Sequence, residues 1–172
     1  MINKLIDELK IEAERQFPVK ETTNLLANLP NLIKDLEPYL FFTPDKYTRN
    51  LIFQSAEFEL LALCWLPGHA APIHGHEGEK CWARVEQGKL RFMSYKDVFT
   101  NNALELALTE EVVGEQGYVD GPAYIHAIEN TFSEPAISLH LYAKPFHECN
   151  VYINNKAERH SLSYDTKFGR KL

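Results

Sequence analysis

The segment from Gly68 to Gly88 constrains this chain most, because it sets two metal-binding side chains at a fixed distance from two turn-forming residues. His74 and His76 stand two residues apart, so on an extended strand both imidazoles leave the same face and can reach one metal ion. Such a pair also occurs on ordinary surface strands and is only half a ligand set. The glycines at both ends favour the metal-binding interpretation, since both suit turns around a strand.

Length and charge narrow the class of protein. A chain of 172 residues is long enough to bury a core without disulfides, and we expect one domain over residues 1–172. The net charge is -6 and no basic patch is present, so neither nucleic acid nor an anionic membrane is an expected partner. The charged N-terminus is unlike a signal peptide, and the 3 cysteines have no paired spacing. We therefore expect a cytoplasmic monomer.

The hydrophobic pattern changes from helical to alternating near residue 47. Apolar residues recur at helical spacing in Ile2–Phe17 and Lys20–Leu36, and Pro18 and Pro30 divide this part into short helices. Residues 1–46 thus form a helical part and connector, and residues 47–172 a β-barrel or sandwich. The expected strands are Tyr47–Gln54, Phe58–Trp65, Cys81–Glu86, Lys89–Tyr95, Glu110–Val113, Tyr118–Asp120, Ala123–Glu129, Ala136–Tyr142, Val151–Asn154 and Ser161–Tyr164.

Further polar residues are candidates for the same site. His126 is a possible third nitrogen ligand, although a lone histidine is as often a satisfied core residue. Ser138, His140 and Tyr142 alternate with leucines, so they share one strand face. That face lines a polar barrel interior or, alternatively, belongs to a solvent-facing edge strand. Arg49 suits a bidentate grip on a carboxylate if it points inward, and position alone does not decide this.

Several motifs resemble those of a known family. The spacing of Gly68, the two histidines and Gly88 is similar to the first motif of the cupin superfamily, with Cys81 at the place of the usual glutamate. Within the cupins the chain resembles the thiol dioxygenases, and among them the cysteine dioxygenases. The motifs that carry this resemblance are Tyr47–Leu51, Leu63–Trp65, His74–Cys81, His126–Asn130, Glu134–Tyr142, Pro145–Cys149 and Lys167–Arg170.

The resemblance implies a cupin-type jelly roll with the short N-terminal helices packed outside, and a particular chemistry within it. His74, His76 and His126 would hold one Fe(II), leaving open positions for the thiolate and amine of L-cysteine and for O2. Arg49, with help from Tyr47, would bind the substrate carboxylate. The product would be cysteine sulfinic acid.

The resemblance also assigns roles beside the metal. Cys81 and Tyr142 match a pair that forms a thioether cross-link in many family members. His140 would hydrogen-bond the Tyr142 hydroxyl, and Ser138 would continue that chain. After the tyrosine many members have Ser-Pro-Pro, with a cis bond at the first proline, whereas this chain has Ala143-Lys144-Pro145.

Two alternatives remain open from the sequence. One is a 3-mercaptopropionate dioxygenase, against which Arg49 argues, because members with that preference resemble a pattern with glutamine near this place. The other is a non-catalytic cupin that binds a metal or a small molecule.

Overall fold

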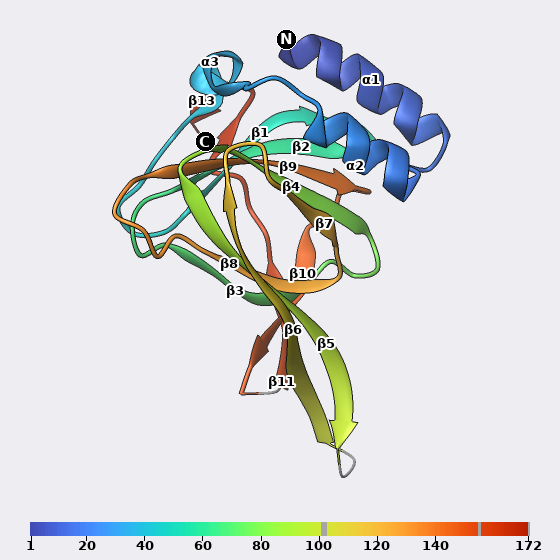
Figure 1. The fold of residues 1–172 in the computed structure, drawn as a ribbon, viewed down its shortest axis with the longest axis vertical. Helices are drawn as coiled ribbons and strands as arrows, with labels where there is room; N and C mark the ends of the chain where they lie inside the picture. The colour runs from blue at the N-terminus through green and yellow to red at the C-terminus, as the bar shows by residue number, and fades with distance from the viewer. Residues whose placement is uncertain (101–102, 155, 172) are drawn as a thin grey trace.

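Two sheets pack against each other in the computed structural model, which describes residues 1–100, 103–154 and 156–171 (Figure 1). Over these residues the larger sheet has the order β13 (Arg170–Lys171), β12 (Thr166–Lys167), β1 (Thr48–Gln54), β2 (Glu59–Trp65), β9 (Ala136–Ala143), β4 (Lys80–Gln87) and β7 (Val119–Ala123). The smaller has the order β11 (Lys156–Ser161), β10 (Glu148–Ile153), β3 (Ala70–Gly75), β8 (Ile125–Glu129), β5 (Lys89–Thr100) and β6 (Ala103–Glu115). The expected all-β fold of the cupin type is confirmed.

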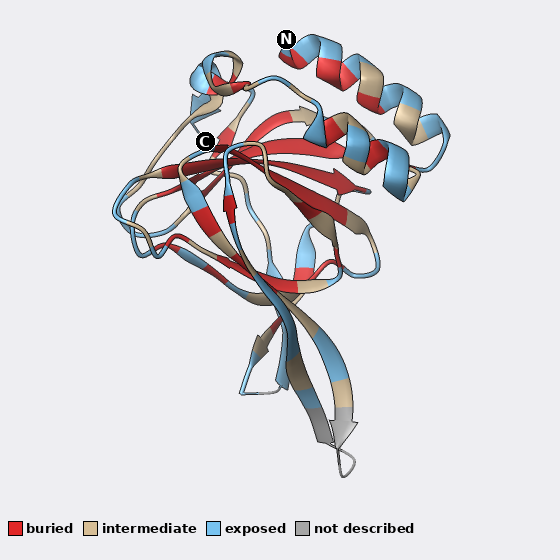
Figure 2. Ribbon diagram, viewed as in Figure 1, coloured by how far each residue is buried: buried red, intermediate tan, exposed pale blue. Residues whose placement is uncertain are grey.

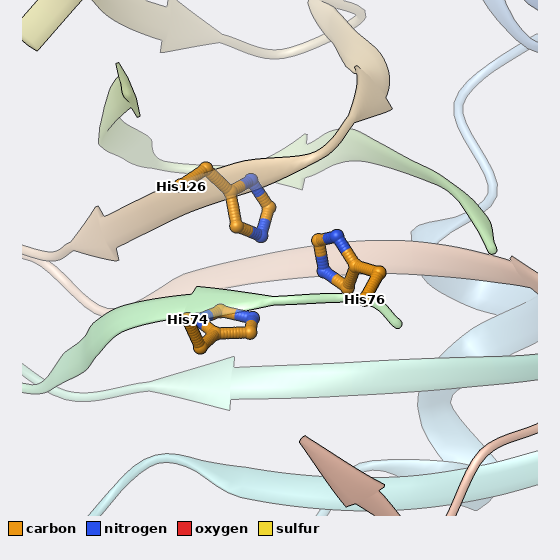
Figure 3. A group of neighbouring side chains, drawn as sticks. All are labelled: His74, His76 and His126. Carbon is orange, nitrogen blue, oxygen red and sulfur yellow. The ribbon is translucent and has the colours of Figure 1, made fainter. Parts of the chain in front are cut away.

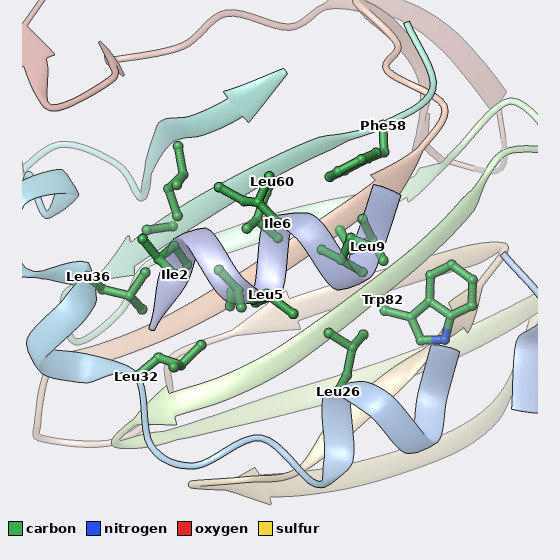
Figure 4. Packing of buried hydrophobic residues seen from close by; sticks show 14 of the residues in the cluster. Ile2, Leu5, Ile6, Leu9, Leu26, Leu32, Leu36, Phe58, Leu60 and Trp82 are labelled. Carbon is green, nitrogen blue, oxygen red and sulfur yellow. The ribbon is translucent and has the colours of Figure 1, made fainter. Parts of the chain in front are cut away.

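The N-terminal helices cover the larger sheet on the side away from the smaller one (Figure 1). They are α1 (Ile2–Glu14), α2 (Val19–Ala27), α3 (Ile33–Leu36) and the 3₁₀ turn η1 (Glu37–Tyr39). Leu5 and Leu9 of α1 pack with Trp82 of β4 in one buried cluster (Figure 4), and each buried leucine contributes roughly 1.5–3 kcal/mol. Among the described helices, none has the length and apolar character that a membrane crossing demands.

The side chains of strand β9 alternate between the two faces of the larger sheet. The outer face contacts the helices, and the inner face contacts the smaller sheet. Leu139 and Leu141 belong to the cluster on the outer face, whereas Tyr142 belongs to the cluster between the sheets. Ser138 and His140 alternate with these leucines and are likewise buried. Because β9 lies between β2 and β4, the alternative of a solvent-facing edge strand is wrong.

The structure corrects several expected boundaries. The first helix ends at Glu14 and not at Phe17, since Gln16 and Phe17 have left-handed φ angles of 58° and 51°. The strands expected at Lys89–Tyr95 and Glu110–Val113 cover only the barrel side of two longer strands, β5 and β6. These form a hairpin that projects from the barrel (Figure 1). Much of its projecting part is exposed (Figure 2), yet Leu106 and Leu108 recur two residues apart and were a sequence signal for the longer β6.

The C-terminal strand expectations were also partly wrong. The strand expected at Ser161–Tyr164 lies earlier, as β11 over Lys156–Ser161, where every residue is exposed. An exposed strand carries no apolar alternation, which explains the shift. The strand that carries the histidine pair, β3, ends at Gly75, so His76 lies one residue beyond it.

Candidate metal centre

Three imidazoles meet at one point between the sheets. His74 on β3 is in register with His126 on the neighbouring strand β8, and His76 follows directly after β3. The ligand atoms of the three residues all lie within 4.8 Å of one another. Figure 3 shows the three rings turned toward a common centre. The structure thus brings together the two histidines of the N-terminal pair and the separate one on β8.

The Nδ1 atom of each ring faces an oxygen, which leaves the opposite nitrogen for a metal. His74 Nδ1 lies 2.8 Å from the carbonyl oxygen of Pro72, His76 Nδ1 3.0 Å from that of Ala123, and His126 Nδ1 3.4 Å from Oδ2 of Asp120. A carbonyl oxygen only accepts, so Nδ1 of His74 and of His76 carries the proton, and Nε2 keeps its lone pair. His76 Nε2 is buried and has no hydrogen-bond partner among the described residues. A metal ion is the partner that such an atom fits.

The surroundings keep these rings in the metal-binding form. Burial, followed by the repulsion from His126, lowers the pKa of His74 to about 3. The same two causes lower the pKa of His76 well below its usual value. Both rings are therefore neutral at pH 7 and donate lone pairs instead of repelling a cation.

The chemistry of the donor set favours a transition metal. Three imidazole nitrogens suit zinc, copper, iron or nickel, and they leave coordination positions open. All three ligands are histidines, so no carboxylate is among them. The carboxylate of Asp120 contacts Nδ1 of His126, on the side of the ring that faces away from the metal position. Neutral ligands leave the charge of a divalent ion uncompensated, so the site favours a ligand that brings negative charge.

A continuous chain of hydrogen bonds runs along the inner face beside the three histidines. Trp65 Nε1 donates to Ser138 Oγ at 2.9 Å, and Ser138 Oγ lies 2.9 Å from His140 Nε2. His140 Nδ1 lies 3.3 Å from the Tyr142 hydroxyl. Burial, followed by the neighbouring His126 and Arg49, lowers the pKa of His140 well below its usual value, so the ring is neutral. The order expected from the alternation of β9 is present.

Arg49 points inward from β1. Its Nη1 lies 3.4 Å from the Tyr142 hydroxyl, and its guanidinium carbon lies 5.3 Å from the centre of the Tyr142 ring. Only 8% of the residue is exposed. Tyr47 stacks on Trp65, with the ring centres 4.5 Å apart, and lines the same cavity as Arg49. The orientation that the sequence left undecided is therefore toward the site.

Cys81 and Tyr142 lie directly opposite each other on β4 and β9. Both are buried, with 1% and 2% of their surface exposed. Burial, and then the charge of Asp120, raises the pKa of the Cys81 thiol well above its usual value, while a contact with Tyr142 opposes the shift. The thiol therefore stays protonated and next to the phenol ring.

The space between these groups is small and polar. Tyr47, Arg49, His74 and Tyr142 line it together with His126 and His140, and a second hollow that shares Tyr47, Arg49 and His74 leads past Phe146 and Cys149. A larger groove on the surface, beside the end of α1, contains none of the three histidines. The enclosed space suits a small polar molecule.

The loop after β9 holds a residue that sequence reasoning gave no role. The Phe146 ring contacts His76 and Tyr142, with ring centres 5.7 and 5.1 Å away. The bond between Ala143 and Lys144 is cis, and the Lys144 backbone N–H donates to Glu79. Asp120 and Phe146 were missed because their positions follow from strand pairing and a loop path, and neither leaves a spacing signal in the sequence.

Comparison with known proteins gives consistent matches. Residues 3–155 match the family described as cysteine dioxygenase type I. The chain is 32% identical over 139 residues to cysteine dioxygenase type 1 of Homo sapiens, across 76% of this chain and 68% of that protein. Its counterpart in Danio rerio is 28% identical over 162 residues, across 89% and 80%. A solved Bacillus halodurans protein superposes with a TM-score of 0.54 at 16% identity, over 80% of this chain and 88% of that one, which shows the fold alone.

Proposed function

Because this chain belongs to the cysteine dioxygenase type I family, we propose that it adds both atoms of O2 to the sulfur of L-cysteine and forms cysteine sulfinic acid. The observation that carries the proposal is the convergence of three imidazoles, whose ligand atoms lie within 4.8 Å of one another. A buried arginine, Arg49, lines the same small cavity as two of them.

The metal in this proposal is Fe(II), held by Nε2 of His74, His76 and His126. Bound iron would supply the positions at which a thiolate and O2 meet, and the electrons that O2 needs. The protein orients the three ligands through their Nδ1 atoms. Backbone carbonyl oxygens contact the rings of His74 and His76, and Asp120 contacts the ring of His126. Such outer contacts set ring orientation and raise ligand basicity.

The proposed substrate site lies across the cavity from the metal. Arg49 presents a planar fork that matches a carboxylate, and Tyr47 lines the same space. A substrate bound by sulfur and amine at one end and by a carboxylate at the other must have a fixed length. This selects L-cysteine over cysteamine, which has no carboxylate. A 3-mercaptopropionate dioxygenase remains the second candidate, since that thiol also carries a carboxylate.

The hydrogen-bond chain determines where the Tyr142 proton points. The indole N–H of Trp65 only donates, so Ser138 Oγ accepts this hydrogen bond and donates its own to His140 Nε2. Neutral His140 then carries its proton on Nδ1 and donates to the Tyr142 oxygen, which Arg49 also approaches. With two donors on its oxygen, Tyr142 is free to direct its hydroxyl proton into the cavity, toward the substrate.

We also propose that Cys81 and Tyr142 form a thioether cross-link. The C–S bond forms as the S–H bond of the thiol and one C–H bond of the ring break, and the two hydrogens with their electrons reduce one O2 to H2O2. Opposite positions on β4 and β9 support the pairing. The link would fix the tyrosine hydroxyl beside the substrate.

Oxygen uptake tests the proposed function. Purified protein reconstituted with ferrous iron is expected to consume O2 when L-cysteine is added, and to form the sulfinate. Kinetics with 3-mercaptopropionate and cysteamine, run side by side, would identify the preferred thiol. A protein that binds no iron and consumes no O2 with any of these thiols would instead favour the non-catalytic cupin. The single domain, the monomeric state and the cytoplasmic location stay proposals for separate tests.

A further inference from the structure

Glu59 is a buried charged residue that the proposed function does not use. It opens β2, lies in register opposite Tyr142 of β9, and is 0% exposed. Residues opposite each other in a sheet share a face, so Glu59 belongs to the inner face. Glutamate is almost never buried to this extent without a partner.

The Glu59 carboxylate is held between two side chains. Its Oε2 accepts a hydrogen bond from the Tyr164 hydroxyl, and its Oε1 lies 3.8 Å from Nη2 of Arg49. The Tyr164 oxygen itself accepts a bond from Gln54 at 3.2 Å, so the Tyr164 proton is directed to Glu59. Within residues 1–100, 103–154 and 156–171, Glu59 Oε1 has no hydrogen-bond partner. One oxygen is thus anchored, while the other faces the guanidinium.

The guanidinium of Arg49 has two polar neighbours, Tyr142 and Glu59, and makes a hydrogen bond to Tyr142 alone among the described residues. Nη1 contacts the Tyr142 hydroxyl at 3.4 Å, and the buried Nε has no hydrogen-bond partner in the part of the chain that the structure describes. Glu59 does not line the cavity that Arg49 and Tyr142 line. The anion therefore lies behind the arginine and leaves donor atoms for a ligand. A buried cation without a counter-charge is costly and would turn toward water.

We infer that Glu59 is a positioning residue for substrate binding: its carboxylate, held by Tyr164, keeps the Arg49 guanidinium buried and oriented before a carboxylate-bearing thiol enters. This inference rests on the proposed function and adds a residue to it. Without Glu59, Arg49 would have to be ordered by the substrate itself, and that ordering lowers affinity. Only thiols that carry a carboxylate are affected.

The test compares Glu59→Gln with the wild type in the iron-loaded protein. Gln keeps the volume and the acceptor for Tyr164 but removes the charge. KM for L-cysteine is expected to rise about tenfold with kcat within about twofold, because binding and not chemistry is weakened. KM for cysteamine, which has no carboxylate, is expected to stay unchanged. Tyr164→Phe is expected to act in the same direction by about threefold.

Glu86→Gln is the matched control. Glu86 is also 0% exposed and paired with an arginine, Arg84, but it contacts the backbone of Leu32 before α3. Its substitution removes a buried charge and is expected to leave the ratio of the two KM values unchanged. If Glu59→Gln alters both KM values equally, or alters neither, the inference is wrong.

A binding measurement separates this inference from the proposed function. Anaerobic calorimetry measures the affinity of iron-loaded protein for L-cysteine and for cysteamine without any turnover. Loss of the preference for L-cysteine in Glu59→Gln supports the inference even if the wild type consumes no O2. A preference that stays intact overturns it even if the wild type is an active dioxygenase.

Discussion

The inner and outer faces of the larger sheet are equally buried, yet their chemistry is opposite. On β9, Leu139 and Leu141 of the outer face are each 1% exposed, and His140 and Tyr142 of the inner face are 1% and 2% exposed. The outer face is covered by apolar residues of the helices. The side chains that β9 places on the inner face are polar, and they hydrogen-bond one another.

The difference shows how one strand serves stability and chemistry at once. Apolar contacts on the outer face stabilise the fold without needing exact hydrogen-bond geometry. The polar side chains that β9 places on the inner face, Ser138, His140 and Tyr142, are tolerated because each has a hydrogen-bond partner, and this fixes their positions. Substitutions on the outer face should therefore reduce stability first, and those on the inner face should reduce function first.

The largest effect is expected at the metal ligands of the inner side. His74→Ala removes one of three nitrogen donors, so iron binding and O2 uptake should both fall to background. Metal analysis of the purified variant measures the first, and an oxygen electrode the second. His160→Ala is the control, because His160 is exposed on β11 and lies outside the centre. Iron bound at wild-type levels by His74→Ala would contradict the proposed ligand set.

Alanine substitutions at the adjacent residues Ser138 and Leu139 compare the inner and outer faces directly, in their effects on stability and on kcat. Leu139→Ala should lower the free energy of unfolding by about 2–5 kcal/mol through the cavity it leaves, while the folded protein keeps its kcat. Ser138→Ala should cost about 1–3 kcal/mol, because Trp65 Nε1 and His140 Nε2 lose a partner, and should reduce kcat as well. Denaturant unfolding and steady-state kinetics check both. Equal loss of kcat in the two variants would remove the distinction.

The Asp120 carboxylate, which contacts His126, is expected to affect iron affinity less than a metal ligand does. Asp120→Asn should reduce iron affinity about 10–100-fold, since the ring loses a charged orienting partner. Competition with a chelator measures the affinity independently of turnover. Wild-type affinity in this variant would show that Asp120 does not act on the metal.

The smallest expected effect is a change in protein mass. It distinguishes the buried Cys81 on the inner face of the larger sheet from the buried Cys64 on the outer face. Cross-linked protein should weigh two hydrogens less than the sequence mass, because one hydrogen leaves the thiol and one the tyrosine ring. Cys81→Ser should abolish this mass difference. Cys64→Ser should not, because Cys64 lies on β2, where its sulfur faces Asn50, whereas Cys81 lies opposite Tyr142. Intact mass spectrometry after repeated turnover decides, and an uncross-linked wild type would refute the link.

The sequence predicted the site better than the outline of the barrel. The spacing of His74 and His76 and the alternation around His140 are local signals, and the structure brings these residues together as expected. The inward direction of Arg49 and the contacts of Glu59 depend on strand pairing across the fold. Tyr164 reaches Glu59 from 105 positions along the chain. The position of β11 was misjudged because its residues are all exposed and impose no apolar pattern, whereas β6 was predicted too short although Leu106 and Leu108 recur two residues apart.

One measurement tests the central claim most directly: mass spectrometry of the product formed from L-cysteine and ¹⁸O₂ by the iron-reconstituted protein. The account predicts a cysteine sulfinate that carries two labelled oxygen atoms, formed only when ferrous iron is present and absent with His74→Ala. A product without label, with one labelled atom, or formed equally well without iron would contradict it.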